Sequence, residues 1–554
     1  MSSDSDKVVF DEAVTQPDKT VLFQSKKWTY INDNSSNGGV FTGQLQFNLN
    51  TLANLNQWSD LSQALIQFPV QLRITNTGTA ATTTAVNQMM ATIKNGFHQF
   101  VDSAQITIGG TTIQSAQIYL NTDTTFKILT EWSLSELHNW GPSLGIALDD
   151  YQLAPDGTST YTSLDNVPLA TSVSAVTGFT LPTASNPGFK ARAQFINNTS
   201  NAKDPATTLN GIINNAPLLG KGSVNYTQGS VPVGSDCFTL MTLATVRLKD
   251  ISDCCAKLPP LKGLKGFIYL NYSSGRYVFT TGASGAINGV TSATALYGHT
   301  HPGMLGTTGT GFGTTASSWQ FTADVCGTAV NGCTVPFVSA RIYVPYLIAN
   351  PDVDRALTQT KSIRYLERFV TSFYIDRLQS FSGTISPGIV NPKRVTLIPM
   401  LIGDSANGAT SGSGTLVNLS TAPEVSATSH EPSGTGPFAA LSGLQIIVGG
   451  LPMFQSPLQM DWESFQTEVV QMGLDGGLNP EQGSGLLNQR LWNSMYRYYT
   501  VDVSRRFTSE DGASKSVIVQ CTNQTYAKMR VIAHIWYERE ITVDTGMGQI
   551  RQGI

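Results

Sequence analysis

Apolar and polar residues alternate in many short runs along this chain. The alternation is clearest at residues 45–49 and 66–74. A period of two places apolar side chains on one face of a strand, so such runs predict strands with one buried face. Pro69 cannot donate a ladder hydrogen bond, which predicts an edge or bulged position. Further strand-like runs lie at 243–248, 267–272, 341–346, 363–374, 394–402, 497–504, 515–521 and 529–543.

Helical spacing is found in a few short segments between these strands. Apolar residues recur every three or four positions around Phe126 and again at 461–470. A shorter stretch at 251–258 has the same spacing and is followed by Pro259 and Pro260. These patterns predict short helices, each with an apolar stripe that packs on a neighbouring sheet.

The chain contains an internal repeat. Residues 105–110 (QITIGG) return as 445–450 (QIIVGG), at an offset of 340 positions (445 minus 105). Four markers in one order predict that one β-rich unit occurs twice, and the paired glycines predict a two-residue hairpin turn in each copy. The other three pairs have offsets of 341, 339 and 330 positions: Gln114 with Gln455, Phe126 with Phe465, and Phe68 with Ile398.

The two units differ in length. Residues 341–346 match 530–537 at an offset of only 189 positions (530 minus 341), so the first unit carries about 150 extra residues (340 minus 189). We expect these as long loops at about 142–235 and 275–335, with another loop at 403–437. We predict a flexible N-terminal arm at 1–23, a first unit at 24–350 and, after a break before Pro351, a second unit at 351–554.

Composition supports a fold built from strands. Charged residues make up 13% of the 554 residues, against about 25% in an ordinary globular protein. Many short strands and few helices predict an all-β sandwich class. The formal net charge is −4 and no run of Lys and Arg occurs, which argues against electrostatic wrapping of nucleic acid. We expect neither a signal peptide nor a membrane span, because no long apolar stretch is present.

The six cysteines are too sparse for a disulfide scaffold. Cys254 and Cys255 suit burial on a helix face. Cys326 and Cys333 flank an Asn-Gly pair and could bond across a hairpin. Because we expect no signal peptide, we expect a reducing compartment, and free thiols at Cys326 and Cys333 are favoured over a disulfide.

We predict no catalytic, cofactor-binding or metal site in this chain. His299 and His301 have no cysteine or carboxylate at ligand spacing, and His534 lies on a core-like strand, where a hydrogen-bonded structural role is favoured over a base. Asp149 and Asp150 would point to opposite faces of a strand, so we expect surface solvation. Without a nucleophile, base and oxyanion set, we expect that the protein is not an enzyme.

The aromatic residues of two segments could either pack within the fold or bind a partner molecule. Residues 461–463 (Asp-Trp-Glu) could present a partner-binding face, although a capping aspartate above a packed tryptophan is favoured. Trp140, Tyr151 and Tyr161 lie near a long loop and could stack on a sugar ring.

Five stretches resemble double jelly-roll major capsid proteins, and their nearest likeness is to those of virophages and polinton-like viruses. The stretches lie in both units, whereas the long loops match no known pattern. They are 94–100 (KNGFHQF), 257–263 (KLPPLKG), 388–394 (GIVNPKR), 499–506 (YTVDVSRR) and 537–544 (YEREITVD).

The resemblance implies an all-β protein of two tandem eight-stranded jelly rolls, with long loop insertions in the first and a few short helices. It also implies a homotrimer that forms a pseudo-hexameric capsomer, contacts neighbouring capsomers, penton and other minor capsid proteins, and encloses double-stranded DNA in an icosahedral virion assembled inside the host cell. The insertions would form an outer tower that could touch a host receptor. Sequence-specific nucleic-acid binding is not expected.

Two other functions stay open at this point. The chain could be a secreted or surface β-sandwich that recognises glycans or a host receptor through its long loops. It could also be an enzyme of the sandwich class, whose active site leaves no trace in the sequence.

Overall fold

The computed structural model describes most of the chain. It covers residues 22–149, 216–401, 440–471, 485–504 and 512–552, together with Gly188, Ala191 and Arg192, apart from short gaps at 36–37, 85–88, 218–220, 228, 282–286, 298–300, 308–316, 495 and 526–527. Residues 1–21 of the arm predicted at 1–23 and the predicted loop at 403–437 lie outside the described residues, and Phe23 begins the first strand.

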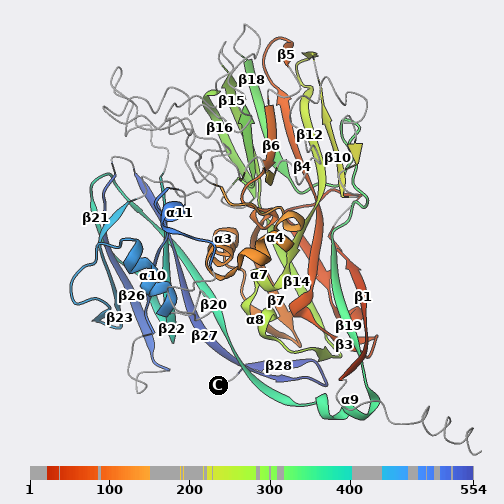
Figure 1. The fold of residues 1–554 in the computed structure, drawn as a ribbon, viewed down its shortest axis with the longest axis vertical. Coiled ribbons are helices and arrows are strands. Elements are labelled where there is room, and N and C mark those ends of the chain that lie inside the picture. The colour runs from red at the N-terminus through yellow and green to blue at the C-terminus, as the bar shows by residue number, and fades with distance from the viewer. Residues whose placement is uncertain are drawn as a thin grey trace, which may run out of the picture.

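Eight strands of the first half form a sandwich of two sheets (Figure 1). One sheet has the order β1-β19-β4-β12, and the other has the order β2-β14-β7-β8. If the eight strands are numbered from one to eight along the chain, the order is 1-8-3-6 in the first sheet and 2-7-4-5 in the second. The strands are β1 (Phe23–Asn32), β2 (Gln44–Asn48), β4 (Leu65–Asn76), β7 (Val101–Ile108), β8 (Thr111–Gln114), β12 (Asp236–Arg247), β14 (Gly266–Tyr272) and β19 (Arg341–Ala349).

Eight strands of the second half repeat this arrangement. One sheet has the order β20-β27-β22-β25 and the other β21-β26-β23-β24, which again count as first-eighth-third-sixth and second-seventh-fourth-fifth. The strands are β20 (Thr360–Ile375), β21 (Ser380–Val390), β22 (Pro392–Leu401), β23 (Leu441–Val448), β24 (Leu451–Pro452), β25 (Tyr499–Asp502), β26 (Ser514–Asn523) and β27 (Met529–Asp544). A ninth strand, β28 (Gln549–Gln552), extends this sheet beyond β27.

This shared order defines the fold. Two facing sheets of four antiparallel strands form a jelly roll when consecutive strands alternate between the sheets, apart from one hairpin that joins the fourth and fifth strands. The chain therefore has two jelly rolls in tandem, and the predicted fold class is confirmed. The repeated hairpin is confirmed as well, because Gly109 and Gly110 have φ of 59° and 85°, and Gly449 and Gly450 have φ of 59° and 86°. Positive φ at both central residues is the requirement of a type I′ turn.

The prediction of long loops in the first half is wrong in part. The segment 275–335 contains four strands, and the predicted loop 142–235 contains three, of a strand-rich region that stands above the first sandwich, where the long strands β4 and β12 continue upward to meet it (Figure 1). Residues 150–187, 189–190 and 193–215 of the loop predicted at 142–235 lie outside the described residues. We call this region the upper extension. It comprises β5 (Thr82–Thr84), β6 (Met89–Ile93), β9 (Ala216–Pro217), β10 (Gly222–Tyr226), β11 (Gly229–Val231), β15 (Ser274–Thr281), β16 (Ile287–Tyr297), β17 (Gly303–Thr307) and β18 (Ser317–Asp324). Its strands are rich in Gly and Thr and carry little apolar alternation, so their sequence pattern resembles that of loops.

The predicted helices around Phe126 and at 461–470 are confirmed as α3 (Leu120–Glu131) and α10 (Trp462–Gln471). The stretch 251–258 is not one helix, because the extended backbone of Ser252 separates α7 from α8, and its hydroxyl accepts a hydrogen bond from the Cys255 N–H. The remaining elements are β3 (Trp58–Ser59), β13 (Leu261–Lys262), α2 (Asn50–Ala53), α4 (Leu134–Leu144), α7 (Leu248–Ile251), α8 (Asp253–Lys257), α9 (Pro351–Leu357), α11 (Gln489–Ser494), η1 (Leu61–Gln63) and η2 (Phe97–Phe100).

Pro69 occupies neither an edge strand nor a bulge. Its strand, β4, lies inside the sheet, with β12 on one side and, on the other, β19 opposite residues 65–67 and β18 opposite 71–76. Pro69 falls in the gap between these two neighbours, where its carbonyl accepts from the Cys326 N–H at 3.1 Å. A strand residue points its N and O to the same side, so the missing donor faces this gap.

The sequence match in the third strand pairs residues that lie on opposite faces of their sheets. Phe68 points into the first core, like the other even-numbered residues of β4, whereas Ile398 lies opposite Ile532 on the outer face of its sheet. A one-residue shift moves a side chain to the other face. The offset of 330 therefore matches the right strands but not equivalent positions.

Candidate functional site: the joint between the two sandwiches

The helices that follow the fifth and sixth strands of the first sandwich fill the space between the two sandwiches (Figure 1). There α3 and α8 meet the outer face of the sheet that contains β20, β27 and β22. We call this contact the joint. It joins the helix side of one jelly roll to the outer sheet face of the other, so two different surfaces of similar units meet.

The two sandwiches exchange core residues across the joint. Tyr119, Phe126 and Leu129 of the first sandwich pack against the outer sheet face of the second and belong to its buried apolar cluster, where the Phe126 ring meets that of Tyr498 edge-on at 5.3 Å. In return, Tyr365 from β20 and several residues near the chain end pack in the core of the first. Those residues are Ile541, Val543 and Ile550. Burial of about 25 cal/mol for each Å² of apolar surface makes such an exchange costly to undo.

The final hairpin of the chain fastens the lower end of the joint. Thr111 donates its hydroxyl to the Ile550 carbonyl at 2.7 Å, and the Lys262 N–H donates to the Thr545 carbonyl at 2.9 Å. Gly109 leaves room for this hairpin, since a Cβ there would lie 3.1 Å from the Ile550 nitrogen. The glycine that turns the hairpin of the first sandwich thus also permits close approach of the second.

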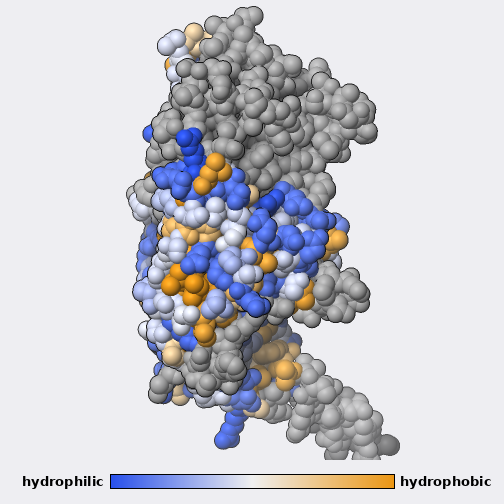
Figure 2. Space-filling view, turned by 90° about the vertical axis from the view of Figure 1, so that its left-hand side faces the viewer, coloured by the Kyte–Doolittle hydropathy of each residue, from blue (hydrophilic) through white to orange (hydrophobic). Residues whose placement is uncertain are grey.

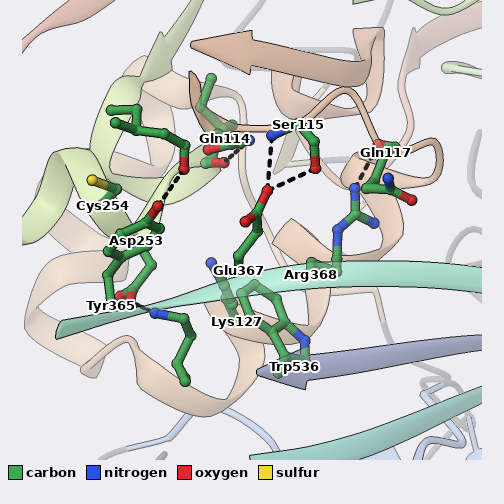
Figure 3. A pocket seen from close by; sticks show the side chains of 13 residues that line it. Gln114, Ser115, Gln117, Lys127, Asp253, Cys254, Tyr365, Glu367, Arg368 and Trp536 are labelled. Atoms are coloured by element: carbon green, nitrogen blue, oxygen red, sulfur yellow. Dashed lines mark hydrogen bonds between the residues drawn. The ribbon is translucent and has the colours of Figure 1, made fainter. Parts of the chain in front are cut away.

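A buried carboxylate holds the centre of the joint (Figure 3). Glu367 accepts from the Ser115 N–H at 3.0 Å and from its hydroxyl at 2.7 Å, and it forms an ion pair with Arg539. Beside it, the Tyr365 hydroxyl donates to the Ile113 carbonyl at 2.8 Å. The Glu367 side chain is 4% exposed, so its charge depends on these partners.

A second carboxylate crosses the joint from α8. Asp253 accepts from the Leu366 N–H at 2.7 Å and pairs with Lys257 at 2.9 Å. Burial alone would raise the pKa of Asp253, but the charge of Lys127, the Leu366 N–H and Lys257 together outweigh it and hold that pKa below its usual value. The carboxylate therefore stays charged and bonded to the backbone of the second sandwich.

His534 lies at the upper end of the same face. Arg368 donates to its Nδ1 at 3.1 Å, so that nitrogen carries no proton, and its Nε2 lies 3.3 Å from the Thr122 hydroxyl. Burial first, and then the charges of Arg368 and Arg394, hold the pKa of His534 well below its ordinary value. The ring is neutral and fully engaged, as the structural interpretation of this residue predicts.

Cations are stacked on aromatic rings next to His534. The Trp536 ring lies between Lys127, at 4.4 Å from the ring centre, and Arg394, at 4.6 Å. Burial lowers the pKa of Arg394, and the charge of Asp123 acts in the opposite direction. Cation–π contacts are strongest where the cation is desolvated, as it is here.

The joint encloses a small polar cavity (Figure 3). About 20 Å³ is open to the centre of a water-sized sphere, with Gln114, Ser115 and Asp253 among the lining residues. That volume fits about one water molecule and no organic ligand. The arrangement can hold two domains rigidly together but offers no room for a substrate.

The residues considered as catalytic candidates have structural surroundings where they are described. His301 is buried and its Nδ1 lies 3.0 Å from the Gly303 carbonyl, whereas His299 lies outside the described residues. Among the residues that the structure describes, no group of three or more His, Cys, Asp or Glu could hold a metal ion. In the same part of the chain, no helix is long and apolar enough to cross a membrane.

The prediction of a solvated Asp149 is wrong. Its carboxylate is fully buried and lies 2.6 Å from the equally buried guanidinium of Arg192, which also donates to the Ile93 carbonyl. Sequence reasoning missed this pair because its partner lies 43 residues away, in a stretch that looked like loop. Asp150 lies outside the described residues.

The favoured interpretation of residues 461–463 is confirmed. The Asp461 carboxylate accepts from the Ser464 N–H at 2.8 Å and caps α10, while the Trp462 ring packs near Trp492 at 6.1 Å. Glu463 is exposed. The cysteine thiols at 326 and 333 are free, and Cys333 is buried.

The glycan interpretation gains little from the aromatic residues. Trp140 is 40% exposed, and the Arg247 guanidinium lies 5.4 Å from its ring centre. Tyr151 and Tyr161 lie outside the described residues.

The strand order and the joint define a double jelly-roll protein. Among solved structures, the chain is similar to one from the Sputnik virophage determined by cryo-electron microscopy, with 10% identity over 96% of this chain and 89% of that chain and a TM-score of 0.47. It is also similar to the mavirus major capsid protein, with 11% identity over 98% of this chain and 94% of that chain and a TM-score of 0.48. No family model and no curated protein sequence matches the chain.

Proposed function

We propose that this chain is the major capsid protein of a virus, and that three copies form a capsomer with a pseudo-hexagonal outline. The observation that carries the proposal is the joint between two jelly rolls of identical strand order. The joint is heterologous, because the helix side of one unit meets the sheet face of the next. Heterologous contacts between like units form a ring when the rotation closes and a filament when it does not.

Each chain has the two surfaces that continue such a ring. The outer sheet face of its first sandwich and the helix side of its second sandwich are the counterparts of the surfaces used in the joint. Three chains joined in this way would place six jelly rolls around one axis. A six-cornered unit tiles a closed shell, which supports an icosahedral capsid.

The rigid joint and the low charge suit this role. A shell subunit must keep its two halves at a fixed angle, and the exchange of core residues at the joint does so. With charged residues at 13%, broad contacts can form without many buried charges that need partners. Neighbouring capsomers, penton and other minor capsid proteins would then be the partners, in a virion around double-stranded DNA.

We further propose that the upper extension is the outer tower of the capsomer and that it could touch a host receptor. It stands above one sandwich only and projects to one end of the molecule (Figure 1). In this arrangement the residues 1–23 would be an arm of the first unit. No catalysis is part of the proposed function.

Sedimentation of the purified full-length chain tests the proposal. We expect a stable trimer of three 59.5 kDa chains at micromolar concentration, and hexagonal outlines in negative-stain micrographs. A protein that stays monomeric at that concentration, or forms closed twofold dimers, would contradict the proposed function.

A further inference from the structure

The outer sheet face of the first sandwich carries exposed aromatic residues. Trp28 and Tyr30 on β1 are 50% and 51% exposed, although both lie within a strand of the main sheet. Each has a cation over its ring, with Lys26 at 5.2 Å from the Trp28 centre and Arg341 at 4.7 Å from the Tyr30 centre. Tyr343 lies opposite Tyr30, with ring centres 5.9 Å apart. We call these five residues the aromatic face.

The same positions in the second sandwich are covered by the joint. If Arg341 is matched with Arg530, the inward residues Ile342 and Val344 match the inward residues at 531 and 533. Under this match, the strand registers make Lys26 equivalent to Arg368 and Trp28 equivalent to Val370. Arg368 donates to the Gln117 carbonyl at 2.6 Å, and the Val370 N–H faces the Gln117 side chain at 3.4 Å. The residues that cover these positions precede and begin α3.

The helix side of the second sandwich provides the matching surface. Continuing the offset of 341 from Gln114 and Gln455, the joint residues Thr122, Phe126 and Leu129 correspond to Glu463, Thr467 and Val470 on α10. Glu463 and Thr467 are exposed and Val470 is half-buried, while the opposite side of α10 packs Phe465 and Val469 into the core of its own sandwich.

This comparison corrects the helix match made from sequence. Phe126 faces the neighbouring sandwich, whereas Phe465 faces its own, so the two phenylalanines are not equivalent. The side of α10 that corresponds to the joint side of α3 exposes one acid, Glu463, and one hydroxyl, Thr467, beside the half-buried Val470. Figure 2 looks onto the side of the second sandwich away from the joint, where apolar residues lie among polar ones.

We propose that the aromatic face of one copy is the docking surface for α10 of a second copy, with Glu463 beside Lys26. This inference rests on the proposed function, because it specifies how one capsid chain contacts the next. The charges are complementary, since Asp461 caps α10 and Glu463 lies in its first turn, whereas Lys26 and Arg341 border the exposed rings. At the positions of Trp28 and Pro345, where the proposed contact between chains has an exposed ring, the joint within the chain has Val370 and the buried His534.

A charge swap tests this assignment in the full-length protein. Lys26→Glu and Glu463→Lys should each weaken trimer association by about ten-fold or more, because each places like charges together. The double variant should recover most of the loss. Lys27→Glu is the matched control, since Lys27 is the adjacent lysine on the opposite parity of β1, and it should leave association unchanged. Circular dichroism of each variant checks that it is folded.

A cysteine pair tests proximity independently of association strength. Lys26→Cys combined with Glu463→Cys should give disulfide-linked dimers and trimers on a non-reducing gel, and Lys27→Cys with Glu463→Cys should not. A wild-type trimer whose variants show neither weakening nor the cross-link would overturn this inference and leave the proposed function standing. A wild-type chain that is only monomeric would contradict the proposed function itself.

Discussion

The outer sheet faces of the two sandwiches have the same strands in the same order but differ in what covers them. In the second sandwich the face is buried at Arg368, Arg394 and His534, which contact Gln117, Phe126 and Thr122 of the first sandwich across the joint. In the first, the face is exposed and carries Trp28 and Tyr30. A face covered within its own chain can use buried polar groups, because their partners are always present. The exposed face of the first sandwich would meet its partner only after the chain has folded, so it must tolerate contact with water until then.

The largest expected effect comes from removing the core side chain that crosses the joint. Phe126→Ala should lower the free energy of unfolding by about 4 kcal/mol, because the ring is fully buried between the two sandwiches. Denaturant titration followed by fluorescence measures this loss. Phe267→Ala is the matched control, since that ring is half-buried and stacks on Tyr269 at 6.0 Å, and it should cost far less. Equal losses would show that α3 does not hold the sandwiches together.

The carboxylate at the centre of the joint should rank next. Glu367→Gln keeps the shape but removes the charge that faces Arg539, so we expect a loss of about 2 to 3 kcal/mol in the free energy of unfolding. Glu538→Gln serves as the control because its ion pairs are longer, at 3.7 Å and 3.9 Å, and partly exposed. Chemical denaturation of both variants at neutral pH makes the comparison, and a larger loss at Glu538 would contradict it.

Lowering the pH should destabilise the outer sheet face of the second sandwich but not that of the first. The second face has the titratable His534 at the position that Pro345 occupies in the first. The folded pKa of His534 lies well below 6.5, so below pH 6.5 the unfolded chain binds a proton that the folded chain does not. Stability therefore falls as the pH drops from 6.5 toward the folded pKa, by up to about 2 kcal/mol between pH 7 and 5.

The measurement is the difference in unfolding free energy between pH 7 and pH 5. His534→Gln should shrink that difference by about 2 kcal/mol. Buried His98, with its pKa lowered to about 3, and His301, with its pKa lowered to about 4, keep their own contributions. Exposed His138→Gln should leave the pH dependence as it is in the wild type. An unchanged difference for His534→Gln would contradict the prediction, because it would show that the folded and unfolded chains bind the His534 proton equally well over this pH range.

The sequence predicts the framework of this molecule better than its joint. Strand periodicity and the two glycine pairs mark both jelly rolls, because alternation and positive φ are local requirements. The joint depends on contacts between residues far apart, such as Ser115 with Glu367, which no local pattern reveals. Phe126 shows the limit clearly. Its spacing predicts a helix, but whether its ring faces the first or the second sandwich depends on the packing of whole domains.

The smallest expected effect on folding is at the aromatic face. It separates the role of this exposed face in association from the role of the buried face in folding. Trp28→Ala removes a side chain that is half exposed, so the free energy of unfolding of the monomer should change by no more than about 0.5 kcal/mol. Association should nevertheless weaken, since tryptophan in an interface often carries a large share of the binding energy. Sedimentation equilibrium and denaturant titration of the same sample separate the two effects. If unfolding weakens and association does not, Trp28 belongs to the fold of its own sandwich, and another surface joins the chains.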